Sequence, residues 1–434
     1  MLDYRPHLGV KNTNLTIGGV DAVSLAEEFG TPLYVVDEER IRERYREFRD
    51  AFLALYPKVE IKYAYKANTN LAVCSILRQE GCSADVLSEG EIRIALKIGL
   101  SPEKIIFTGN NKTQGELELA VDSGVIINVD AIHELERLKR ICAEKNKEAI
   151  ISFRINPGIS PDTHPHLSTG LKKSKFGIHE ESVLTAYGEA VACEHFKIKG
   201  IHMHIGSQIT KTSPYEEATA KLFDIVGDLK DRLGVELEFV DLGGGLGIRY
   251  DKENQYITPK DLASALIPIV RDKIEEYSLK EPLLYFEPGR YIVGDSTIML
   301  TKVSTIKKTP FKKFIGTDAG FHVFPRPVIY GAYHEALVAN RMNQEDTEVV
   351  DIAGNVCESG DILAVDRSLP VIEGDDIIAF LDAGAYCFIM ASQYNSRPRP
   401  AEVLVKNGGY ELIRERESLE DLLEKEIVPE RLLS

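Results

Sequence analysis

Short runs of β-branched and aromatic residues alternate with longer helical patterns through the middle of the chain. Apolar residues are spaced as in amphipathic helices in Leu71–Gln79, Glu89–Ile98, Ile132–Ala143 and Tyr215–Leu233. Such alternation predicts parallel strands joined by crossover helices. About eight units in roughly 250 residues is typical of a (β/α)₈ barrel, and a doubly wound open sheet is the alternative. The expected strands are Val59–Tyr65, Ser83–Leu87, Lys104–Phe107, Val125–Val129, Ala149–Ile155, Lys199–Ile205, Glu236–Leu242 and Leu283–Glu287.

The pattern changes after about residue 297, where short runs separated by Gly, Pro and Asp turns predict an antiparallel β domain, sandwich-like or barrel-like. Near the end, Ser418-Leu-Glu-Asp predicts a short capped helix. We expect a barrel domain over residues 37–296 and a β domain made of residues 1–36 and 297–434. The expected β-domain runs are Thr301–Ile306, Lys313–Thr317, Glu348–Ala353, Ile377–Leu381 and Ala401–Lys406, with Leu33–Val36 ahead of the first strong helix, Glu38–Leu55.

The composition narrows the classes of function. With 52 Lys and Arg against 68 Asp and Glu, the formal net charge is −16, and such a field repels nucleic acids and anionic lipids. No apolar run approaches the roughly 20 residues of a membrane span, and the start lacks the apolar stretch of a secretory signal. The six cysteines are scattered without a CxxC pair, which is typical of a reducing compartment. We therefore expect a cytoplasmic protein that binds neither nucleic acid nor membrane.

Polar residues stand where the expected barrel strands end, and active sites of such barrels lie there. Lys66 closes the first strand, either as a functional group or as a lysine emerging into solvent, and Asp85 interrupts the apolar second strand. His202 and His204 are two residues apart in the sixth strand and so face the same side. An H-x-H pair can bind zinc, and His164-Pro-His166 is another, but neither has an HExxH motif or a clustered third ligand. We expect no metal.

A glycine cluster follows the seventh strand in Asp241-Leu-Gly-Gly-Gly-Leu-Gly247. Glycines 243–245 allow close backbone approach and a group of N–H donors for an anion. The spacing is not GxGxxG, no helix opens there, and the Gly-Lys-Ser/Thr of a P-loop is missing, which argues against dinucleotide and P-loop sites. A site for a single phosphate and a plain tight turn remain as interpretations. The eighth strand ends in Glu287-Pro-Gly-Arg290, an acid and a base at the same mouth.

Together these residue types describe a pyridoxal phosphate site. A lysine forms a Schiff base with this cofactor, and a flat side chain such as histidine stacks on its ring. A group of backbone N–H donors holds the phosphate, and a carboxylate pairs with the pyridine nitrogen. Each feature is weak alone, but their joint position at strand ends favours this site.

The chain resembles the pyridoxal-phosphate amino-acid decarboxylases that combine an alanine-racemase-like barrel with a β domain, and among them the diaminopimelate decarboxylases. The resemblance covers nearly the whole chain, and it is specific because the motifs occur in the family's order and spacing. One departure is Leu167 in Pro165-His-Leu-Ser-Thr-Gly170, where the family leads us to expect an aromatic residue. The matching motifs are Tyr65-Lys-Ala-Asn, His202-Met-His-Ile-Gly-Ser-Gln, Gly243-Gly-Gly, Glu287-Pro-Gly-Arg, Cys357-Glu-Ser-Gly-Asp and Asp382-Ala-Gly-Ala-Tyr386.

The resemblance implies a role for each matched residue. Lys66 would hold the cofactor as an internal aldimine, His204 would stack on the ring, and Glu287 would keep the pyridine nitrogen protonated. Cys357 would return a proton to Cα. An isolated cysteine is otherwise explained as core packing, but the polar loop Val356–Asp361 predicts an accessible thiol. The other cofactor contacts would be Asp85, Ser207, Gly243, Gly244, Gly245, Gly289, Arg290 and Tyr386.

Substrate choice depends on the far end of the bound amino acid. Relatives acting on ornithine and arginine have Asp after the cysteine, whereas Glu358 follows Cys357 here, as in the diaminopimelate enzymes, where this acid contacts the distal ammonium. Arg290 and Arg326 have planar forks suited to a distal carboxylate. Arg326 is otherwise explained as a surface-loop arginine, and the resemblance favours substrate binding. Tyr330 and Tyr386 would complete the substrate site.

The resemblance implies decarboxylation of meso-2,6-diaminopimelate to L-lysine and CO₂, the last step of lysine biosynthesis. It also implies a homodimer with shared active sites, because Cys357 and Glu358 belong to the β domain and Lys66 to the barrel. Two alternatives stay open: a sibling decarboxylase of ornithine, arginine or carboxynorspermidine, and a cofactor-binding regulator without turnover. Cys357 and Glu287 argue against a regulator, because neither is needed merely to hold the cofactor.

Overall fold

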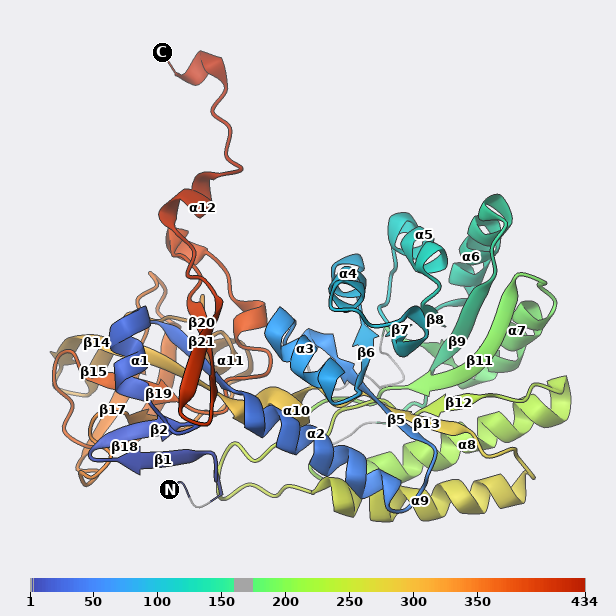
Figure 1. The fold of residues 1–434 in the computed structure, drawn as a ribbon, viewed down its shortest axis with the longest axis horizontal. Coiled ribbons are helices and arrows are strands. Elements are labelled where there is room, and N and C mark those ends of the chain that lie inside the picture. The colour runs from blue at the N-terminus through green and yellow to red at the C-terminus, as the bar shows by residue number, and fades with distance from the viewer. Residues whose placement is uncertain (1, 3, 160–174, 434) are drawn as a thin grey trace. The chain divides into compact units, whose positions relative to one another are not determined.

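The computed structural model describes residues 2, 4–159 and 175–433, and Figure 1 shows the course of the chain. The chain divides into two compact units, residues 41–293 and residues 1–40 with 294–434. The second H-x-H pair, His164 and His166, and the departure at Leu167 lie outside the described residues. Within the described ranges, no helix combines the length and apolar character needed to cross a membrane.

Eight parallel strands of the unit 41–293 form a closed barrel (Figure 1). The ring closes because β13 pairs with β5 and β8 pairs with β9, and this confirms the barrel over the open sheet. All eight expected strands are present, with ends that differ by up to three residues. They are β5 (Val59–Ala64), β6 (Ser83–Val86), β7 (Ile105–Phe107), β8 (Ile126–Val129), β9 (Ala149–Asn156), β11 (Phe196–Met203), β12 (Phe239–Asp241) and β13 (Leu283–Phe286), and β10 (Ile178–His179) extends the sheet beside β9.

Amphipathic helices follow most of the barrel strands and cover their outer side, while one long helix precedes the first strand and the last helix is a single buried turn. Their starts are set by local capping: Asn70 accepts a hydrogen bond from the amide of Ala72, and Thr258 forms a capping box with Asp261. The helices are α2 (Glu38–Leu53), α3 (Leu71–Gln79), α4 (Glu89–Lys97), α5 (Gln114–Ser123), α6 (Ile132–Lys145), α7 (Glu180–Val191), α8 (Ser213–Leu233), α9 (Pro259–Glu276) and α10 (Arg290–Val293), and short 3₁₀ turns lie at Tyr65–Ala67 and Pro102–Lys104.

Alternation along the strands decides which side chains face the barrel interior. Phe239 and Tyr285 stack there with ring centroids 4.3 Å apart, and Lys62 places its Nζ atom 4.1 Å from the centre of the Tyr285 ring. Gly200 leaves room for the ring of Phe239, because a Cβ atom at residue 200 would lie 2.2 Å from it. Side chains therefore fill the barrel interior around Phe239 and Tyr285. An active site has to lie beyond the ends of the strands.

The other unit is a predominantly antiparallel β structure. Its main sheet has the path β18-β17-β15-β14-β4-β20-β21, with β16 and β19 branching from β14, and β1, β2 and β3 form a small separate sheet. The strands are β1 (Leu8–Lys11), β2 (Asn14–Ile17), β3 (Val20–Asp21), β4 (Leu33–Asp37), β14 (Thr297–Lys308), β15 (Lys313–Thr317), β16 (Ala336–Val338), β17 (Glu348–Ala353), β18 (Ile362–Leu369), β19 (Ile377–Phe380), β20 (Ala401–Lys406) and β21 (Gly409–Arg414). Its helices are α1 (Ala22–Phe29), α11 (Arg326–Tyr330) and α12 (Leu419–Leu423).

Strand β4 holds this unit together. It pairs antiparallel with β14 and parallel with β20, and β15 with β17 is the other parallel pair. Leu33 and Val35 lie in one apolar core, whereas Tyr34 lies in a second core on the opposite face. A strand buried on both faces reads as a continuous apolar run, which is what Leu33–Val36 is.

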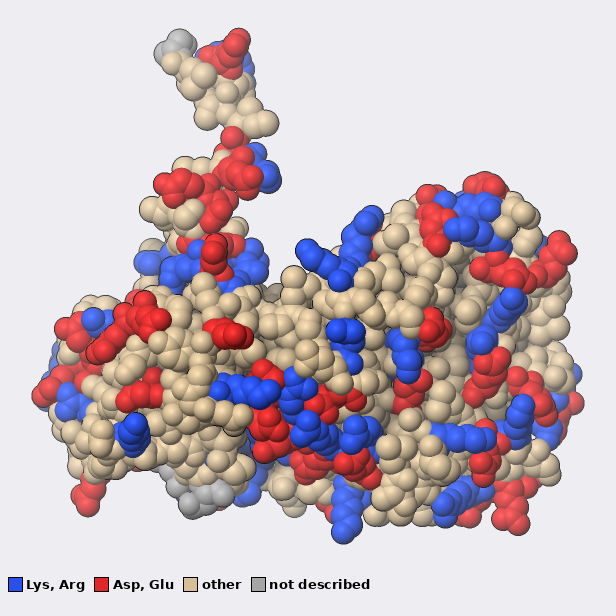
Figure 2. Space-filling view, in the orientation of Figure 1, with Lys and Arg blue, Asp and Glu red and all other residues tan. Residues whose placement is uncertain are grey.

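Charged side chains of both signs are interspersed on the face of the molecule that Figure 2 shows. Some charged side chains form ion pairs: Arg42 and Arg46 of α2 each place a nitrogen 2.7 Å from the Glu80 carboxylate. The Glu80 side chain is only 9% exposed, so these pairs are partly shielded from water.

Candidate active site

Lys66 lies in the 3₁₀ turn that follows β5. Its Nζ atom is 3.0 Å from Oδ2 of Asp85 on β6, and the hydroxyl of Thr108 donates to the other oxygen of that carboxylate. Asp85 is fully buried, whereas 29% of the Lys66 side chain is exposed. Burial raises the pKa of Asp85, as does the negative charge of Glu287, while Lys66 opposes the shift. The lysine is therefore anchored by a buried acid and still accessible.

Glu287 follows β13 and points into the barrel. Its Oε2 atom lies 3.1 Å from Nε2 of His202 on β11, and its Oε1 atom is buried without a hydrogen-bond partner among the described residues. Burial raises the pKa of Glu287, but the proximity and hydrogen bond of His202 and the charge of Lys66 outweigh it and hold that pKa well below its usual range. Glu287 therefore offers one ionised oxygen to a cation or an N–H donor.

His204 lies just beyond the end of β11, and its Nδ1 atom accepts a hydrogen bond of 3.3 Å from the amide of Gly244. Desolvation, followed by the positive charges of Lys66 and Arg154, holds the pKa of His204 well below its usual range. A neutral, flat ring therefore stands close to the amino group of Lys66. The shared face expected for His202 and His204 agrees with the electrostatic contact that each makes with Glu287.

The glycine cluster is packed so tightly that side chains are excluded. A Cβ atom at Gly243, Gly244 or Gly245 would lie 2.0–2.3 Å from a backbone oxygen of a neighbouring loop. Gly243 and Gly245 also have positive φ angles, of 70° and 105°. The amide of Glu287 donates to the Gly243 carbonyl, so this loop and the acid are positioned together.

Arg290 is buried at the start of α10 and is bound within the barrel unit. Its Nη2 atom lies 3.0 Å from Oγ of Ser207, and its Nη1 atom lies 2.6 Å from the hydroxyl of Tyr250. Gly289 beside it packs against the turn that carries Lys66, since a Cβ there would lie 3.0 Å from that of Ala67. Ser207 and Arg290, predicted separately, are thus neighbours.

Cys357 and Glu358 are both exposed, on the loop between β17 and β18 of the other unit. The amide of Cys357 donates to Oδ1 of Asn395, which holds this loop against the turn around Asn395. The thiol is accessible, as the polar loop predicts. The other five cysteines are buried.

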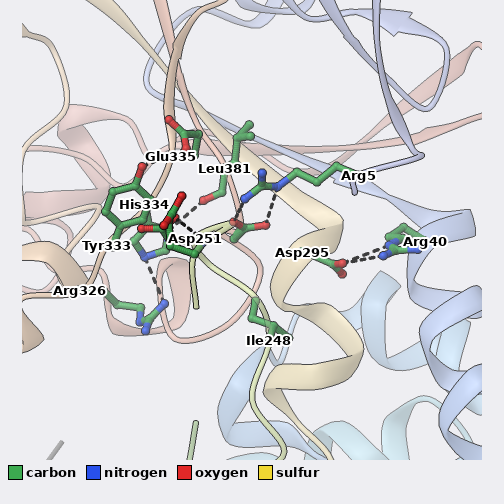
Figure 3. Close-up of polar contacts among 12 residues, drawn as sticks. Arg5, Arg40, Ile248, Asp251, Asp295, Arg326, Tyr333, His334, Glu335 and Leu381 are labelled. Carbon is green, nitrogen blue, oxygen red and sulfur yellow. Dashed lines mark hydrogen bonds and ion pairs between the residues drawn. The ribbon is translucent and has the colours of Figure 1, made fainter. Parts of the chain in front are cut away.

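Arg326 is buried at the start of α11, so the interpretation as a surface-loop arginine is wrong. Its Nη1 atom lies 3.1 Å from Nε2 of His334, and Nδ1 of His334 lies 2.8 Å from the carbonyl oxygen of Leu381 (Figure 3). Because that Nδ1 must donate to the carbonyl, Nε2 accepts from the guanidinium. Tyr330 ends the same helix, with its hydroxyl 3.9 Å from Sδ of Met390.

Tyr386 is partly buried and has a positive φ of 59°. The Asp382 of its motif accepts from Arg5, with Nη2 and Oδ2 2.5 Å apart and both side chains buried. In the same unit Arg40 forms a second buried pair with Asp295, at 2.7 Å (Figure 3). Asp382 thus connects the N-terminal segment to the loop that carries Tyr386.

Comparison with known proteins gives the family. The family described as "Pyridoxal-dependent decarboxylase, pyridoxal binding domain" matches residues 38–294. The chain belongs to this family. Membership confirms the cofactor expected from the sequence, pyridoxal phosphate, and the expected class of reaction, decarboxylation.

Relatives with diaminopimelate decarboxylase names match over nearly their whole length. The enzyme of Methanothermobacter thermautotrophicus is 50% identical over 97% of both chains. That of Archaeoglobus fulgidus is 46% identical over 96% of this chain and 98% of its own. Among solved structures, diaminopimelate decarboxylase from M. jannaschii in co-complex with L-lysine is 43% identical, with a TM-score of 0.93 over 98% of this chain and 99% of that one.

The residues of this pyridoxal-dependent decarboxylase fit the cofactor. The unpartnered Oε1 of Glu287 is an acceptor suited to a protonated ring nitrogen, and the glycine cluster, which has no room for Cβ atoms, leaves its backbone without side chains for an anion to approach. The accessible amino group of Lys66 is of the kind that condenses with an aldehyde.

Sequence reasoning missed several polar groups that the barrel brings to this place. A single polar residue inside a short apolar strand produces no periodic pattern from which its role could be read. Asn128 is such a residue, and so is Asp85, which was predicted. His202, Asp241 and Glu287 lie close enough to share an ion, with ligand-type atoms within 4.8 Å of one another, but His202 and Glu287 hydrogen-bond each other directly. The missed residues are Thr108, Asn128, Ser152, Asp241 and Tyr250.

Proposed function

We propose that this chain decarboxylates meso-2,6-diaminopimelate to L-lysine and CO₂. The observation that carries the proposal is the likeness to the M. jannaschii enzyme, whose structure holds L-lysine, at 43% identity over almost the full length of both chains. Lysine is the product expected from this reaction. The barrel supplies the lysine, acid, flat ring and anion cradle that the chemistry requires.

Pyridoxal phosphate, when bound, supplies an electron sink for the electron pair that CO₂ leaves behind. Lys66 would attach the cofactor, and Asp85 orients its amino group from 3.0 Å. Oε1 of Glu287 would accept the hydrogen bond of the protonated ring nitrogen, and His204 would lie against the ring as a neutral imidazole. The amides of Gly243–Gly245, with Ser207, Gly289, Arg290 and Tyr386, would bind the phosphate end.

The substrate is held by groups at both of its ends. Arg326 and Arg290 pair with the distal carboxylate through their planar guanidinium forks, and Glu358 pairs with the distal ammonium. Tyr330 and Tyr386 line the substrate site. Cys357 donates the proton that replaces CO₂ at Cα, a role that its exposed thiol supports.

The active protein is a homodimer with shared sites. Cys357 and Lys66 belong to different compact units, and one site needs both, Lys66 to hold the cofactor and Cys357 to return the proton to the substrate. Co-expressing Lys66→Ala and Cys357→Ala chains should restore activity, because one site of each mixed dimer receives both intact residues. Random pairing gives roughly one active site in four. Inactive, verified heterodimers would mean that each site is complete within one chain.

The proposed compartment is the cytoplasm, where thiols stay reduced. All six cysteines are free, including the exposed Cys357 on which the proton transfer depends. Oxidation of that thiol would block the reaction.

Product analysis tests the proposed reaction. Purified holoenzyme given meso-diaminopimelate should release CO₂ and L-lysine in equal amounts, and the Lys66→Ala protein should release neither. CO₂ release from ornithine, arginine or carboxynorspermidine, with none from diaminopimelate, would replace the proposal by the sibling decarboxylase.

A further inference from the structure

A chain of buried hydrogen bonds runs across the barrel to Glu287. The hydroxyl of Ser152 on β9 lies 2.7 Å from Oδ1 of Asn128 on β8, and Nδ2 of Asn128 lies 3.0 Å from Nδ1 of His202. Nε2 of His202 is in turn 3.1 Å from Oε2 of Glu287. All four residues are at most 2% exposed, so water does not compete for these bonds.

The direction of each bond in this chain follows from the one before. Ser152 donates to the amide oxygen of Asn128, which turns the amide N–H group towards His202. Nδ1 of His202 must then accept, so the ring carries its hydrogen on Nε2 and donates it to Glu287. A donor at this oxygen favours the ionised form of the Glu287 carboxyl, and Oε1 is left for another donor.

We propose that Ser152, Asn128 and His202 are positioning residues that keep Glu287 ionised, so that the proton shared by Glu287 and the cofactor ring stays on the ring nitrogen. This inference rests on the proposed role of Glu287. It assigns a role to Ser152 and Asn128, which are too deep in the barrel to touch the substrate.

The surroundings of Glu287 show why it needs such a donor. Two further carboxyl groups face it, Asp85 and Asp241, and burial raises the pKa of each. A buried acid beside other acids tends to take up a proton, and only specific donors or cations oppose this. The facing groups that favour the ionised form are His202, Lys66, His204 and Arg154.

Among these, His202 is held from both sides of its ring. His204 accepts from the amide of Gly244, and Lys66 is paired with Asp85. His202 hydrogen-bonds Glu287 directly, and Asn128 fixes the tautomer that donates this bond. Loss of this donor should move the shared proton from the ring to Glu287.

A matched pair of variants at residue 202 tests the proposal. In His202→Gln the amide nitrogen can replace Nε2 as a donor, whereas His202→Met has similar length and no donor. The readout is the ¹⁵N resonance of the ring nitrogen in holoenzyme loaded with ¹⁵N-labelled pyridoxal phosphate, because protonated and unprotonated pyridine nitrogens resonate at well-separated shifts. We expect the protonated position in the wild type and in His202→Gln, and a shift towards the unprotonated position in His202→Met.

Asn128→Leu provides a second test that leaves His202 and Glu287 in place. Removing the amide donor frees His202 to take the other tautomer, so a smaller shift in the same direction is expected. It also replaces His202→Met if that protein does not fold or bind the cofactor.

Each other outcome overturns part of the account. A wild-type resonance at the unprotonated position would remove the proposed role of Glu287 together with that of the hydrogen-bond chain. If the ring nitrogen is protonated in the wild type and its resonance is unchanged in His202→Met or Asn128→Leu, only the role of the hydrogen-bond chain would be overturned. Equal shifts in His202→Gln and His202→Met would also overturn it, since the donor would then not matter.

Discussion

The Nζ atom of Lys66 lies 3.0 Å from Oδ2 of Asp85, and Thr108 donates to the other oxygen of the same carboxylate. These three residues come from or follow three successive barrel strands, β5, β6 and β7. The closed sheet therefore sets the place of the amino group. Its position at the strand ends is where barrels of this kind carry their chemistry.

The first prediction concerns attachment of the cofactor. Borohydride reduction of the holoenzyme, followed by digestion and mass spectrometry, should find the cofactor on the peptide that contains Lys66. Lys62→Met is the matched control, because Lys62 lies on β5, just before the turn that carries Lys66, and pairs with Glu60 instead. It should leave the modified peptide unchanged. A Lys66→Ala protein that still carries covalent cofactor after reduction would remove Lys66 from this role.

The second prediction concerns the ring nitrogen. Glu287→Gln replaces an ionised acceptor by a neutral amide and should lower kcat by about 10²-fold or more, roughly 2.7 kcal/mol. Cofactor should still bind, because the glycine cradle and Arg290 are unchanged. Single-turnover rates and bound cofactor per chain, measured on the same sample, separate the two effects. An unchanged kcat would show that Glu287 has no part in the reaction.

Arg326 is the residue on which substrate choice is predicted to depend. Losing a desolvated guanidinium–carboxylate contact costs roughly 2–5 kcal/mol, so Arg326→Ala should reduce kcat/KM for diaminopimelate by roughly 30- to 5,000-fold. Trace activity on lysine or ornithine, which lack the distal carboxylate, should fall much less. Arg326→Lys should recover part of the loss.

Arg341→Ala is the control for this experiment, since that arginine pairs with Asp376 in the same unit. It should leave the preference among substrates unchanged. Equal losses on all substrates in Arg326→Ala would mean that Arg326, held by His334, supports the fold or the cofactor.

The fourth prediction is about stability. Arg5 and Asp382 form a buried ion pair, so Asp382→Ala leaves a buried guanidinium without its carboxylate. This should lower the free energy of unfolding by about 3–5 kcal/mol, measured by denaturant titration. The double variant Arg5→Met with Asp382→Leu should recover most of the loss, because no unpaired charge remains. A double variant as unstable as Asp382→Ala would show that the charge pairing is not the cause.

The fold was predictable from the sequence where a periodic pattern repeats. Buried parallel strands such as Ile105–Phe107 read as continuous apolar runs, and Ser418 caps α12 with Asp421, as the capping signal predicts. The small sheet β1–β3 and helix α1 were missed, because two- to four-residue strands and an eight-residue helix are too short for a clear period. The parallel pair of β4 and β20 joins segments more than 360 residues apart, so no local signal reports it.

The site was predictable where residues carry reactive groups at strand ends, as with Lys66 and Glu287. Supporting residues were harder, because Asn128 and Ser152 look like isolated polar interruptions of apolar strands. Their role depends on register: Asn128 pairs with Ser152 across β8 and β9, while His202 approaches from β11. The sequence could not decide whether Arg326 is buried or lies on a surface loop, for a similar reason: its burial depends on His334 and on the strand order of the β unit.

The central claim is most directly tested by kcat/KM values for meso-diaminopimelate, ornithine, arginine, carboxynorspermidine and lysine, measured with one preparation of holoenzyme. Contact with a distal carboxylate is worth roughly 2–5 kcal/mol in a desolvated site, so diaminopimelate should lead every substrate without that group by about 30-fold or more. A kcat/KM for ornithine or arginine that equals or exceeds the value for diaminopimelate would contradict the account.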